Sequence, residues 1–474
     1  MESVKQYLAI ILHRITSMKL LVVILFILGF SEGSAQQAIA LFSSKRDSVE
    51  YSKLQATIFS IFQGSKFGPS DPASHKLDSL LQAQRGYRDK IIGYKFIYTP
   101  DKQFTNYQDL KSGKVRPEEV TKLSFSDSPL KALPREVSLC TNLSELELVN
   151  TKVRRWPAGL NKLQRLQSIY VYNNSIPGRL RLGRNTAIRT LVIRGVYERN
   201  LPNSYKHLKA LETLDLSKNI GLSHFPNIYR NRSLVKLNLL ENNLTLDDLK
   251  DGSALRLEEL NLMKNKIKKV PDALGSFPQL KKLTFNYNEI AEVKPGIGNL
   301  KQLEVLSFYQ NKLTSVPAGI FELENLRSID LYFNQIQEVS AEIGRMKKLQ
   351  ILYLANNQLK SLPDDLGQLS NLRELYLHNN KISALPEAMK DLKSLRVLRI
   401  NNNYFTSFPA SILALRDIEN LDVSKNYLYR FPLELSQFRK LEILSVLNNP
   451  WENEDDLRRV SVELRSRGTI VHEK

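Results

Sequence analysis

Residues 349–371 read LQILYLANNQLKSLPDDLGQLSN, and the fold can be predicted from the pattern in this segment. Apolar residues stand at its first, fourth and sixth positions, Asn357 is ninth, and a Leu-Pro pair takes positions 14 and 15. The alternation of Leu352, Tyr353 and Leu354 predicts a short strand with one buried face. The pattern recurs every 23 residues, and positions are therefore numbered 1–23 within each copy. The copies that follow it closely begin at Leu257, Leu280, Leu303, Leu326, Leu349, Leu372, Leu395 and Ile418.

Asparagine recurs at the ninth position over an even longer part of the chain. An amide side chain can both donate and accept, so stacked copies can satisfy backbone groups that the turn after the strand leaves unpaired. We therefore expect a structural ladder formed by Asn219, Asn242, Asn265, Asn288, Asn311, Asn334, Asn357, Asn380, Asn403, Asn426 and Asn449.

A fixed period of this length is typical of a solenoid, because one strand cannot bury its apolar face alone whereas stacked copies can. The pattern over residues 120–449 resembles the leucine-rich repeat family. The proline at position 15 resembles the 23-residue "LP" subtype of plant intracellular Ras-group-related proteins and of many bacterial ones. The resemblance implies an α/β solenoid, a right-handed horseshoe whose parallel sheet lines the concave side. It implies binding without naming a partner, because the family varies its exposed positions over a constant frame.

Looser copies precede the regular ones and divide the chain. They begin at Val120, Leu143, Leu166, Ile188, Leu211 and Leu234, which gives about fourteen full repeats and one partial repeat over residues 120–449. Both open ends of a solenoid need covering. We therefore expect an N-terminal helical cap at residues 36–119, with helices at 49–62 and 73–84 and a strand at 91–99. A C-terminal cap is expected at residues 450–474, where Trp451 covers the last layer and Asn453 begins a helix.

The first 35 residues have the pattern of a signal peptide. Lys19 is followed by an apolar run over residues 20–30, and Gly33 and Ala35 are small residues placed before a cut. Because eleven residues are short for a bilayer span, we expect cleavage after Ala35 and export to the periplasm, the cell surface or the medium. An uncleaved N-terminal anchor is the alternative, and either Met1 or Met18 could be the true start.

The single cysteine, Cys140, excludes a disulfide framework within the chain. Secreted animal and plant relatives in the family usually carry cysteine-rich caps, so their absence favours a bacterial origin. A cytosolic scaffold similar to the Ras-group-related proteins would also lack such caps, and this alternative stays open.

The formal net charge of +19 raises the question of a nucleic-acid partner. Positions 3, 5 and 7 of each copy should point out of the concave sheet, since positions 4 and 6 are buried. These positions carry both signs, with Arg194, Lys236, Lys282 and Arg399 beside Glu145, Glu147, Asp215, Glu259, Asp330, Glu374 and Asp422. A groove for phosphates should have one sign, so no nucleic-acid partner is expected. The basic region Arg179–Arg199 could still contact an anionic lipid or polysaccharide.

Catalytic motifs are absent from the sequence. The six histidines have no metal-ligand spacing, and there is no phosphate loop, nucleophile elbow or dinucleotide fingerprint. We therefore predict a non-enzymatic protein with no catalytic residues, no cofactor and no metal site.

Aromatic residues gather at the concave positions of consecutive copies. Strands lie about 4.8 Å apart, so four copies would give an aromatic strip roughly 15 Å long. Exposed tyrosines offer rigid contact area with a hydrogen-bonding tip, which suits a protein partner or a glycan on a cell surface. The alternative is that the rings only stack between strands and stabilise the sheet. The predicted partner-binding residues are Tyr287, Tyr309, Tyr332, Phe333, Tyr353, Tyr376 and His378.

Overall fold

The computed structural model describes residues 38–42, 44–64, 80, 83–84, 87, 91–96, 103–172, 185–196, 203–253 and 255–473. The expected signal peptide at residues 1–35 and most of the expected helix at 73–84 lie outside these ranges. So do Arg179, Arg181, Arg184 and Arg199 of the basic region.

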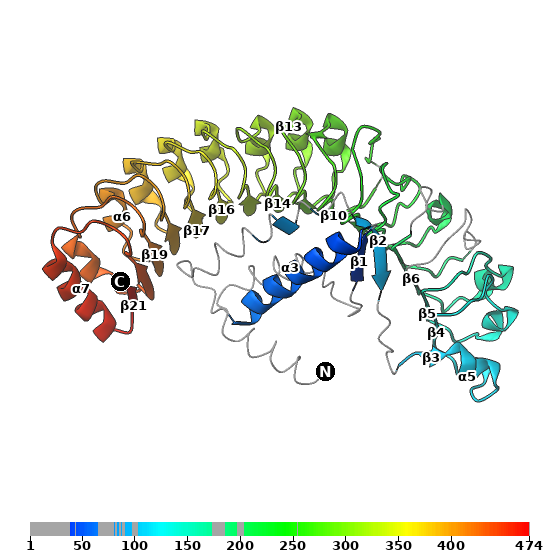
Figure 1. Ribbon diagram of the computed structural model, residues 1–474. Helices are drawn as coiled ribbons and strands as arrows, with labels where there is room; N and C mark the ends of the chain where they lie inside the picture. Colours follow the sequence, from blue (N-terminus) through cyan, green and yellow to red (C-terminus); the bar gives the residue numbers. More distant parts are fainter. Residues whose placement is uncertain are drawn as a thin grey trace.

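In the described residues, a parallel sheet of seventeen strands lines the concave side of a horseshoe (Figure 1). This architecture confirms the α/β solenoid that the repeat predicts. Strand order follows chain order, and each strand pairs in parallel with the next in a constant register, for example Leu352 with Leu375. The strands are β3 (Thr105–Asn106), β4 (Lys122–Ser126), β5 (Glu145–Val149), β6 (Ser168–Tyr172), β7 (Thr190–Arg194), β8 (Thr213–Asp215), β9 (Lys236–Asn238), β10 (Glu259–Asn261), β12 (Lys282–Thr284), β14 (Val305–Ser307), β15 (Ser328–Asp330), β16 (Ile351–Tyr353), β17 (Glu374–Tyr376), β18 (Val397–Arg399), β19 (Asn420–Asp422), β20 (Ile443–Ser445) and β21 (Ile470–His472).

The core is one continuous layer between this sheet and the convex side. In the copy that begins at Leu349, the residues at positions 1, 4, 6 and 11 are almost fully buried, and the equivalent residues of the neighbouring copies pack against them. Each buried leucine contributes on the order of 1.5–3 kcal/mol of burial free energy. Stacking is therefore the main source of stability, as it is in repeat proteins generally.

The convex side returns through short 3₁₀ helices. Proline precedes many of them in an extended conformation, as at Pro363 with φ −74°, because its fixed φ suits a helix entry that needs no ladder N–H. These elements are η2 (Pro117–Glu119), η3 (Arg135–Leu139), η4 (Ala158–Lys162), η5 (Asn203–His207), η6 (Asp272–Ser276), η7 (Pro295–Asn299), η8 (Ala318–Glu322), η9 (Ala341–Arg345), η10 (Asp364–Gln368), η11 (Glu387–Asp391) and η12 (Leu433–Gln437), with α6 (Ala410–Leu413) and the paired strands β11 (Lys269–Val270) and β13 (Glu292–Val293).

The chain turns out of each strand through a left-handed residue at position 8. Non-glycine residues take this conformation from Asp127 to Asn448, with φ between 47° and 60°, and Gly195 takes it in the fourth copy. Asparagine tolerates this region better than most residues. The same conformation occurs at Tyr287 and Phe333, and it places both rings beside the concave face.

The C-terminal end carries helix α7 (Glu454–Ser466) and the last strand, β21. The indole nitrogen of Trp451 donates to the carbonyl oxygen of Val446 at 3.1 Å, and the ring packs edge-on against Phe431. Asn453 directly precedes the helix but does not cap it. Its side-chain oxygen instead accepts from the backbone N–H of Phe431, which ties the helix to the preceding repeat.

The N-terminal end of the sheet is covered by a short segment immediately before the repeats. β3 adds a strand beside β4, and Tyr107 of α5 (Tyr107–Lys111) stacks on Phe125 at 4.6 Å between ring centroids. Leu110 is buried there. A segment of about fifteen residues is enough, because only one layer of core needs shielding.

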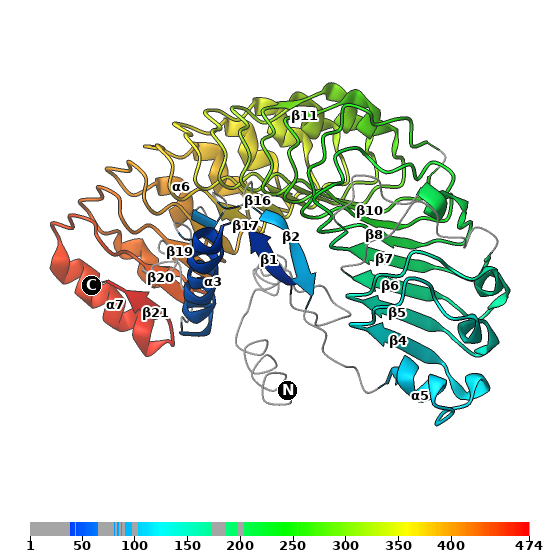
Figure 2. The same cartoon turned by 45° about the vertical axis from the view of Figure 1, so that its right-hand side comes forward.

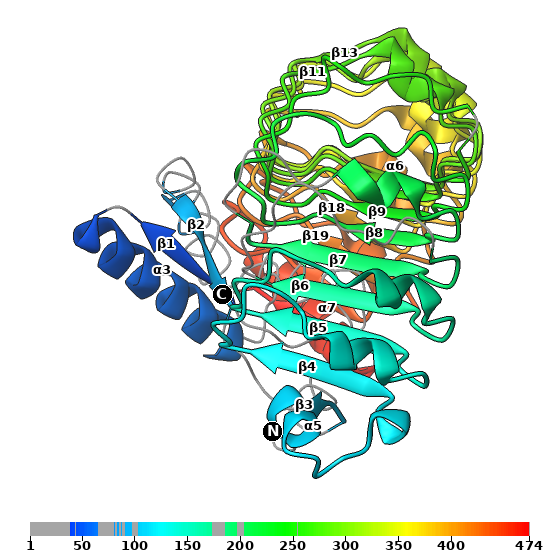
Figure 3. The same ribbon diagram turned by 90° about the vertical axis from the view of Figure 1, so that its right-hand side faces the viewer.

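The described part of residues 38–96 does not take the expected position at the open end. β1 (Ala38–Phe42) and β2 (Ile91–Phe96) form an antiparallel pair, and α3 (Lys45–Gly64) packs beside β1. Figures 1 and 2 show these elements inside the arc, on the concave side of the solenoid. Figure 3 shows them beside one edge of the early strands. The helix expected at 49–62 and the strand expected at 91–99 are present, but they lie against the C-terminal ends of the early strands, on the concave side, and not at the open end of the sheet.

Candidate partner-binding surface

The three central residues of a repeat strand decide which side chains face outward. In β16 the middle residue, Leu352, is buried, and Tyr353 points to the concave side with part of its ring exposed. Because the register is constant, side chains at position 5 form a row across the sheet. From β15 to β21 this row runs Asp330, Tyr353, Tyr376, Arg399, Asp422, Ser445 and His472.

Two tyrosines form the centre of that row. The rings of Tyr353 and Tyr376 stack with centroids 4.7 Å apart at an angle of 18°. The hydroxyl of Tyr376 donates to Glu374 at 3.0 Å, and the guanidinium of Arg399 lies 5.5 Å from the centre of the Tyr376 ring. Burial raises the pKa of both tyrosine hydroxyls, so both stay protonated donors across the physiological range. The ring stack, the hydrogen bond and the contact with Arg399 together hold this pair in place.

A second aromatic group spans several repeats. Tyr309 stacks on Tyr332 at 5.5 Å, and Tyr332 meets Phe333 edge-on at 4.5 Å. The Tyr332 hydroxyl lies 3.1 Å from Nε2 of His378, which belongs to the second repeat further on. The His378 ring also lies edge-on to Tyr376, with centroids 6.5 Å apart, so the two aromatic groups form one strip.

The strip is not uniformly exposed. Tyr287 and Tyr309 are 6% and 8% exposed, and they form an apolar cluster with Leu240 and Met263. Of the seven residues that the sequence singles out, five keep partly exposed side chains on the concave side, namely Tyr332, Phe333, Tyr353, Tyr376 and His378. Stacking between repeats and outward exposure therefore coexist in the same row of rings.

The asparagines at position 9 bind the backbone at the edge of this surface. The amide nitrogen of Asn357 donates to the carbonyl oxygens of Leu354 and Leu331, at 3.0 and 2.9 Å. Its side-chain oxygen accepts from the N–H of Ile336 at 2.9 Å. The same donations to the strand's own turn and to the preceding repeat recur at Asn219, Asn242, Asn265, Asn288, Asn311, Asn334, Asn380, Asn403, Asn426 and Asn449.

Charges of both signs lie on the concave face, as the sequence predicts. Arg194 and Asp215 form a buried ion pair at 2.5 Å, and Arg189 of the basic region pairs with Glu212. Asp330 accepts from the N–H of Tyr332 at 3.0 Å and from the Ser307 hydroxyl at 3.1 Å. Burial nevertheless raises the pKa of Asp330 to about 6. The surface is therefore an alternating polar and aromatic strip without one dominant sign.

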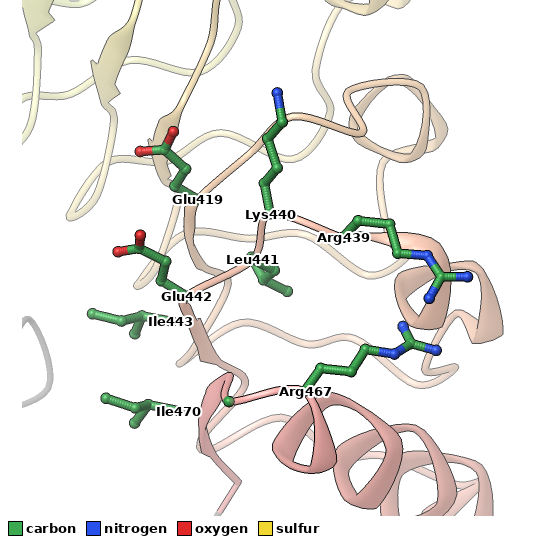
Figure 4. A pocket seen from close by; sticks show the side chains of 9 residues that line it. Glu419, Arg439, Lys440, Leu441, Glu442, Ile443, Arg467 and Ile470 are labelled. Atoms are coloured by element: carbon green, nitrogen blue, oxygen red, sulfur yellow. The ribbon is translucent and has the colours of Figure 1, made fainter.

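A separate hollow of about 540 Å³ lies at the C-terminal end, between the last repeats and α7. Figure 4 shows the carboxylates of Glu419 and Glu442 pointing to one side and the guanidinium groups of Arg439 and Arg467 to the other. Its lining contains no serine, cysteine or histidine that could act as a nucleophile or base. Within the described ranges, no three His, Cys, Asp or Glu side chains come together as metal ligands. The helices of the same ranges are all too short or too polar to cross a bilayer.

Sequence reasoning missed one feature of the concave face. The last residues of β5 and β6, Val149 and Tyr172, are buried, as is Val192 of β7, and they pack against Ala40 of β1 and Tyr51 of α3. The signal was present in the sequence, because these three residues put apolar side chains at positions 5 and 7, where exposed residues are expected. Such positions indicate a covered surface.

Comparison with known proteins agrees with this architecture. A family model described as leucine rich repeat matches residues 278–336, 324–382 and 347–405. No curated protein sequence matches the chain. Among solved structures, a leucine-rich repeat protein of Leptospira interrogans is 27% identical with a TM-score of 0.62, and the match covers 77% of this chain and 99% of that one.

Two other structures share the fold at lower identity. The Drosophila Toll–Spätzle complex matches with a TM-score of 0.59 at 18% identity, over 76% of this chain and 53% of that one. A plant peptide hormone receptor, RGFR1, in complex with RGF2 matches with a TM-score of 0.50 at 24% identity, over 70% and 58%. The repeat pattern, the parallel sheet, the family model and these structures agree. Residues 278–405 match the leucine-rich repeat family, and the chain shares the fold of solved leucine-rich repeat proteins.

Proposed function

We propose that this protein is an exported, non-catalytic recognition protein that binds a protein partner on its concave face. The observation that carries the proposal is the strip of partly exposed aromatic residues, Tyr332, Phe333, Tyr353, Tyr376 and His378. Ring stacking and the Tyr332–His378 contact hold these side chains in place before any partner arrives. Binding then costs little side-chain entropy, which favours recognition by such residues.

The polar groups around the strip suit a polypeptide better than a nucleic acid. Arg399 and Asp422 lie in the same row as the tyrosines, so donors, acceptors and apolar ring edges alternate along one line. Protein interfaces commonly combine aromatic anchors with a polar surround. Within the same fold, the plant receptor was solved with RGF2 and Toll with Spätzle.

The experiment is a pull-down from an envelope extract of the native organism. The bait is the chain without residues 1–35, and the test variant changes Tyr332, Tyr353 and Tyr376 to serine. The matched control changes Tyr404 and Tyr427, which are 50% and 52% exposed and lie after the asparagine of their repeats, outside the concave row. A partner retained by the wild type and the control but lost with the test variant supports the proposal. Equal retention by all three baits contradicts the assignment to the strip.

The proposed export has its own test, which is the intact mass of the protein isolated from its native organism. A mature chain that begins at Gln36 supports cleavage after Ala35. Retention of residues 1–35 would favour the uncleaved anchor instead.

A further inference from the structure

An apolar patch lies on the concave face of the second to fourth repeats, far along the sheet from the aromatic strip. It consists of Val149, Tyr170, Tyr172 and Val192 and is called here the early concave patch. Val149 is fully buried and Tyr172 is 1% exposed, although both are at position 7 of their repeats. In the fifth repeat the corresponding position holds Ser217, and position 5 holds Asp215. The early concave patch is therefore apolar where the next repeat is polar.

The chain's own N-terminal segment covers this patch. Ala40 of β1 and Tyr51 of α3 are 6% and 7% exposed and share one apolar cluster with the patch, with Tyr87 and Ile91 packed against it. Burial, and to a smaller extent the charge of Glu241, raises the pKa of the Tyr51 hydroxyl. The hydroxyl therefore stays neutral where α3 packs against the concave face. β1, α3 and β2 are called here the N-terminal unit.

The N-terminal unit depends on this docking for its order. Two antiparallel strands without a third are marginal in water, and a single helix of twenty residues is little better. Within the unit β1 and β2 pair with each other, and α3 contacts the segment before β2 through Tyr87 to Glu50 at 2.6 Å and Gln84 to Tyr51 at 3.4 Å. The solenoid, by contrast, is stabilised by its own stacking and does not need the unit. The contact can therefore open without unfolding the repeats.

We propose that the early concave patch is a partner-binding surface that the N-terminal unit occupies in the free protein. A partner reaches the patch by displacing the unit. The resident side chains define the chemistry that the patch accepts, which is a polypeptide segment with small apolar and aromatic residues. The proposal rests on the proposed function only in that both assign recognition to the concave face. It adds a second binding surface, for which the N-terminal unit and the partner compete.

The test uses the full chain and the substitution Tyr51→Asp, which places a charge at the buried contact. The matched control is Val49→Asp, two residues earlier on α3, where the side chain is already 45% exposed. Amide hydrogen exchange of α3 should become at least roughly tenfold faster in Tyr51→Asp, because an undocked helix frays. Exchange in β16–β20 should stay unchanged, and Val49→Asp should match the wild type.

A hydrophobic dye, bis-ANS, then reports whether the patch is open. Its fluorescence should rise several-fold on Tyr51→Asp, because an apolar surface becomes accessible. The rise should disappear when Val192→Asp is added to the same chain. Saturating dye should also speed the exchange of α3 in the wild type, since an apolar ligand competes with the unit.

Two outcomes would overturn the proposal. The first is unchanged exchange of α3 in Tyr51→Asp, and the second is faster exchange without a gain in dye fluorescence. If exchange in β16–β20 also quickens, the variant has perturbed the solenoid, and Tyr51→Ser takes its place with the same expected direction. None of these measurements needs the natural partner, so their failure is distinguishable from a failed pull-down with the aromatic strip.

Discussion

The amide nitrogen of Asn357 donates to the carbonyl oxygen of Leu331, twenty-six residues earlier and one repeat away, at 2.9 Å. The same nitrogen donates to Leu354 within its own repeat. One side chain thus joins two neighbouring turns whose backbone groups are shielded from water. Because an unpaired buried backbone group is costly, this relationship makes the asparagine a structural requirement and not only a family signature.

Replacing Asn357 with leucine should lower the free energy of unfolding by about 1–3 kcal/mol, because it leaves the N–H of Ile336 without a partner and removes one of the two amide donors to each of the carbonyl oxygens of Leu331 and Leu354. Urea denaturation followed by circular dichroism measures the change. Lys360→Leu, at an exposed position three residues on, should change stability by less than about 0.5 kcal/mol. Equal stability of the Asn357 variant and the wild type would contradict this account of the ladder.

The buried ion pair of Arg194 and Asp215 should be sensitive to loss of one partner. The side chains are 12% and 9% exposed, and Asn238 also donates to Asp215 at 2.9 Å. Asp215→Ala leaves an uncompensated buried guanidinium and should cost about 3–5 kcal/mol. The double variant Arg194→Met with Asp215→Leu should recover part of that loss. If Asp215→Ala were as stable as the double variant, the guanidinium of Arg194 would not be desolvated.

Asp330 predicts a specific dependence of stability on pH. Its pKa is about 6 in the folded chain against an ordinary value of 3.8. Between these values the folded chain binds more protons than the unfolded chain, so the free energy of unfolding falls as the pH rises through this window. The charged carboxylate then destabilises the fold above about pH 6, by about 1–2 kcal/mol for a group that is only half-buried.

Asp330→Asn removes this titration while keeping an acceptor for the N–H of Tyr332 and for Ser307. The variant should therefore match the wild type near pH 4 and exceed its stability at pH 7.5. Denaturation of both proteins at the two pH values measures the difference. A gap between the two proteins that stays constant with pH would contradict the raised pKa.

The convex side predicts a steric limit at Gly367. A Cβ atom built there would lie 2.2 Å from the carbonyl oxygen of Ala388 in the next repeat, and backbone cannot easily move away. Gly367→Ala should therefore lower the free energy of unfolding by about 1–3 kcal/mol, because the added methyl group overpacks this position. Gln368→Ala at the neighbouring exposed position is the control and should have a much smaller effect. Calorimetry of the two variants measures the difference. Equal stability of Gly367→Ala and Gln368→Ala would contradict close packing at Gly367.

The framework of the solenoid could be predicted from the sequence alone. A 23-residue period with leucines at fixed positions can bury its apolar residues in only one way, by stacking in parallel, so Leu352 and Leu375 had to be neighbours. The asparagines follow from the same logic, since each lies where a turn leaves backbone groups unpaired. Local chemistry and a repeated register were enough for these features, because every contact involves equivalent residues one repeat apart.

The exposure of the candidate site could be learned only from the folded chain. Tyr309 and Tyr332 both stand at position 7 of neighbouring repeats, but Tyr309 is buried in a cluster with Met263, whereas Tyr332 keeps part of its ring exposed on the concave side. The place of the N-terminal unit was equally hidden. Tyr51 and Tyr172 belong to one apolar cluster although more than one hundred residues separate them in the chain, and no period relates the two. Residues outside the repeats have no register with the repeat strands. The residues that they contact therefore depend on shape and burial in the folded chain.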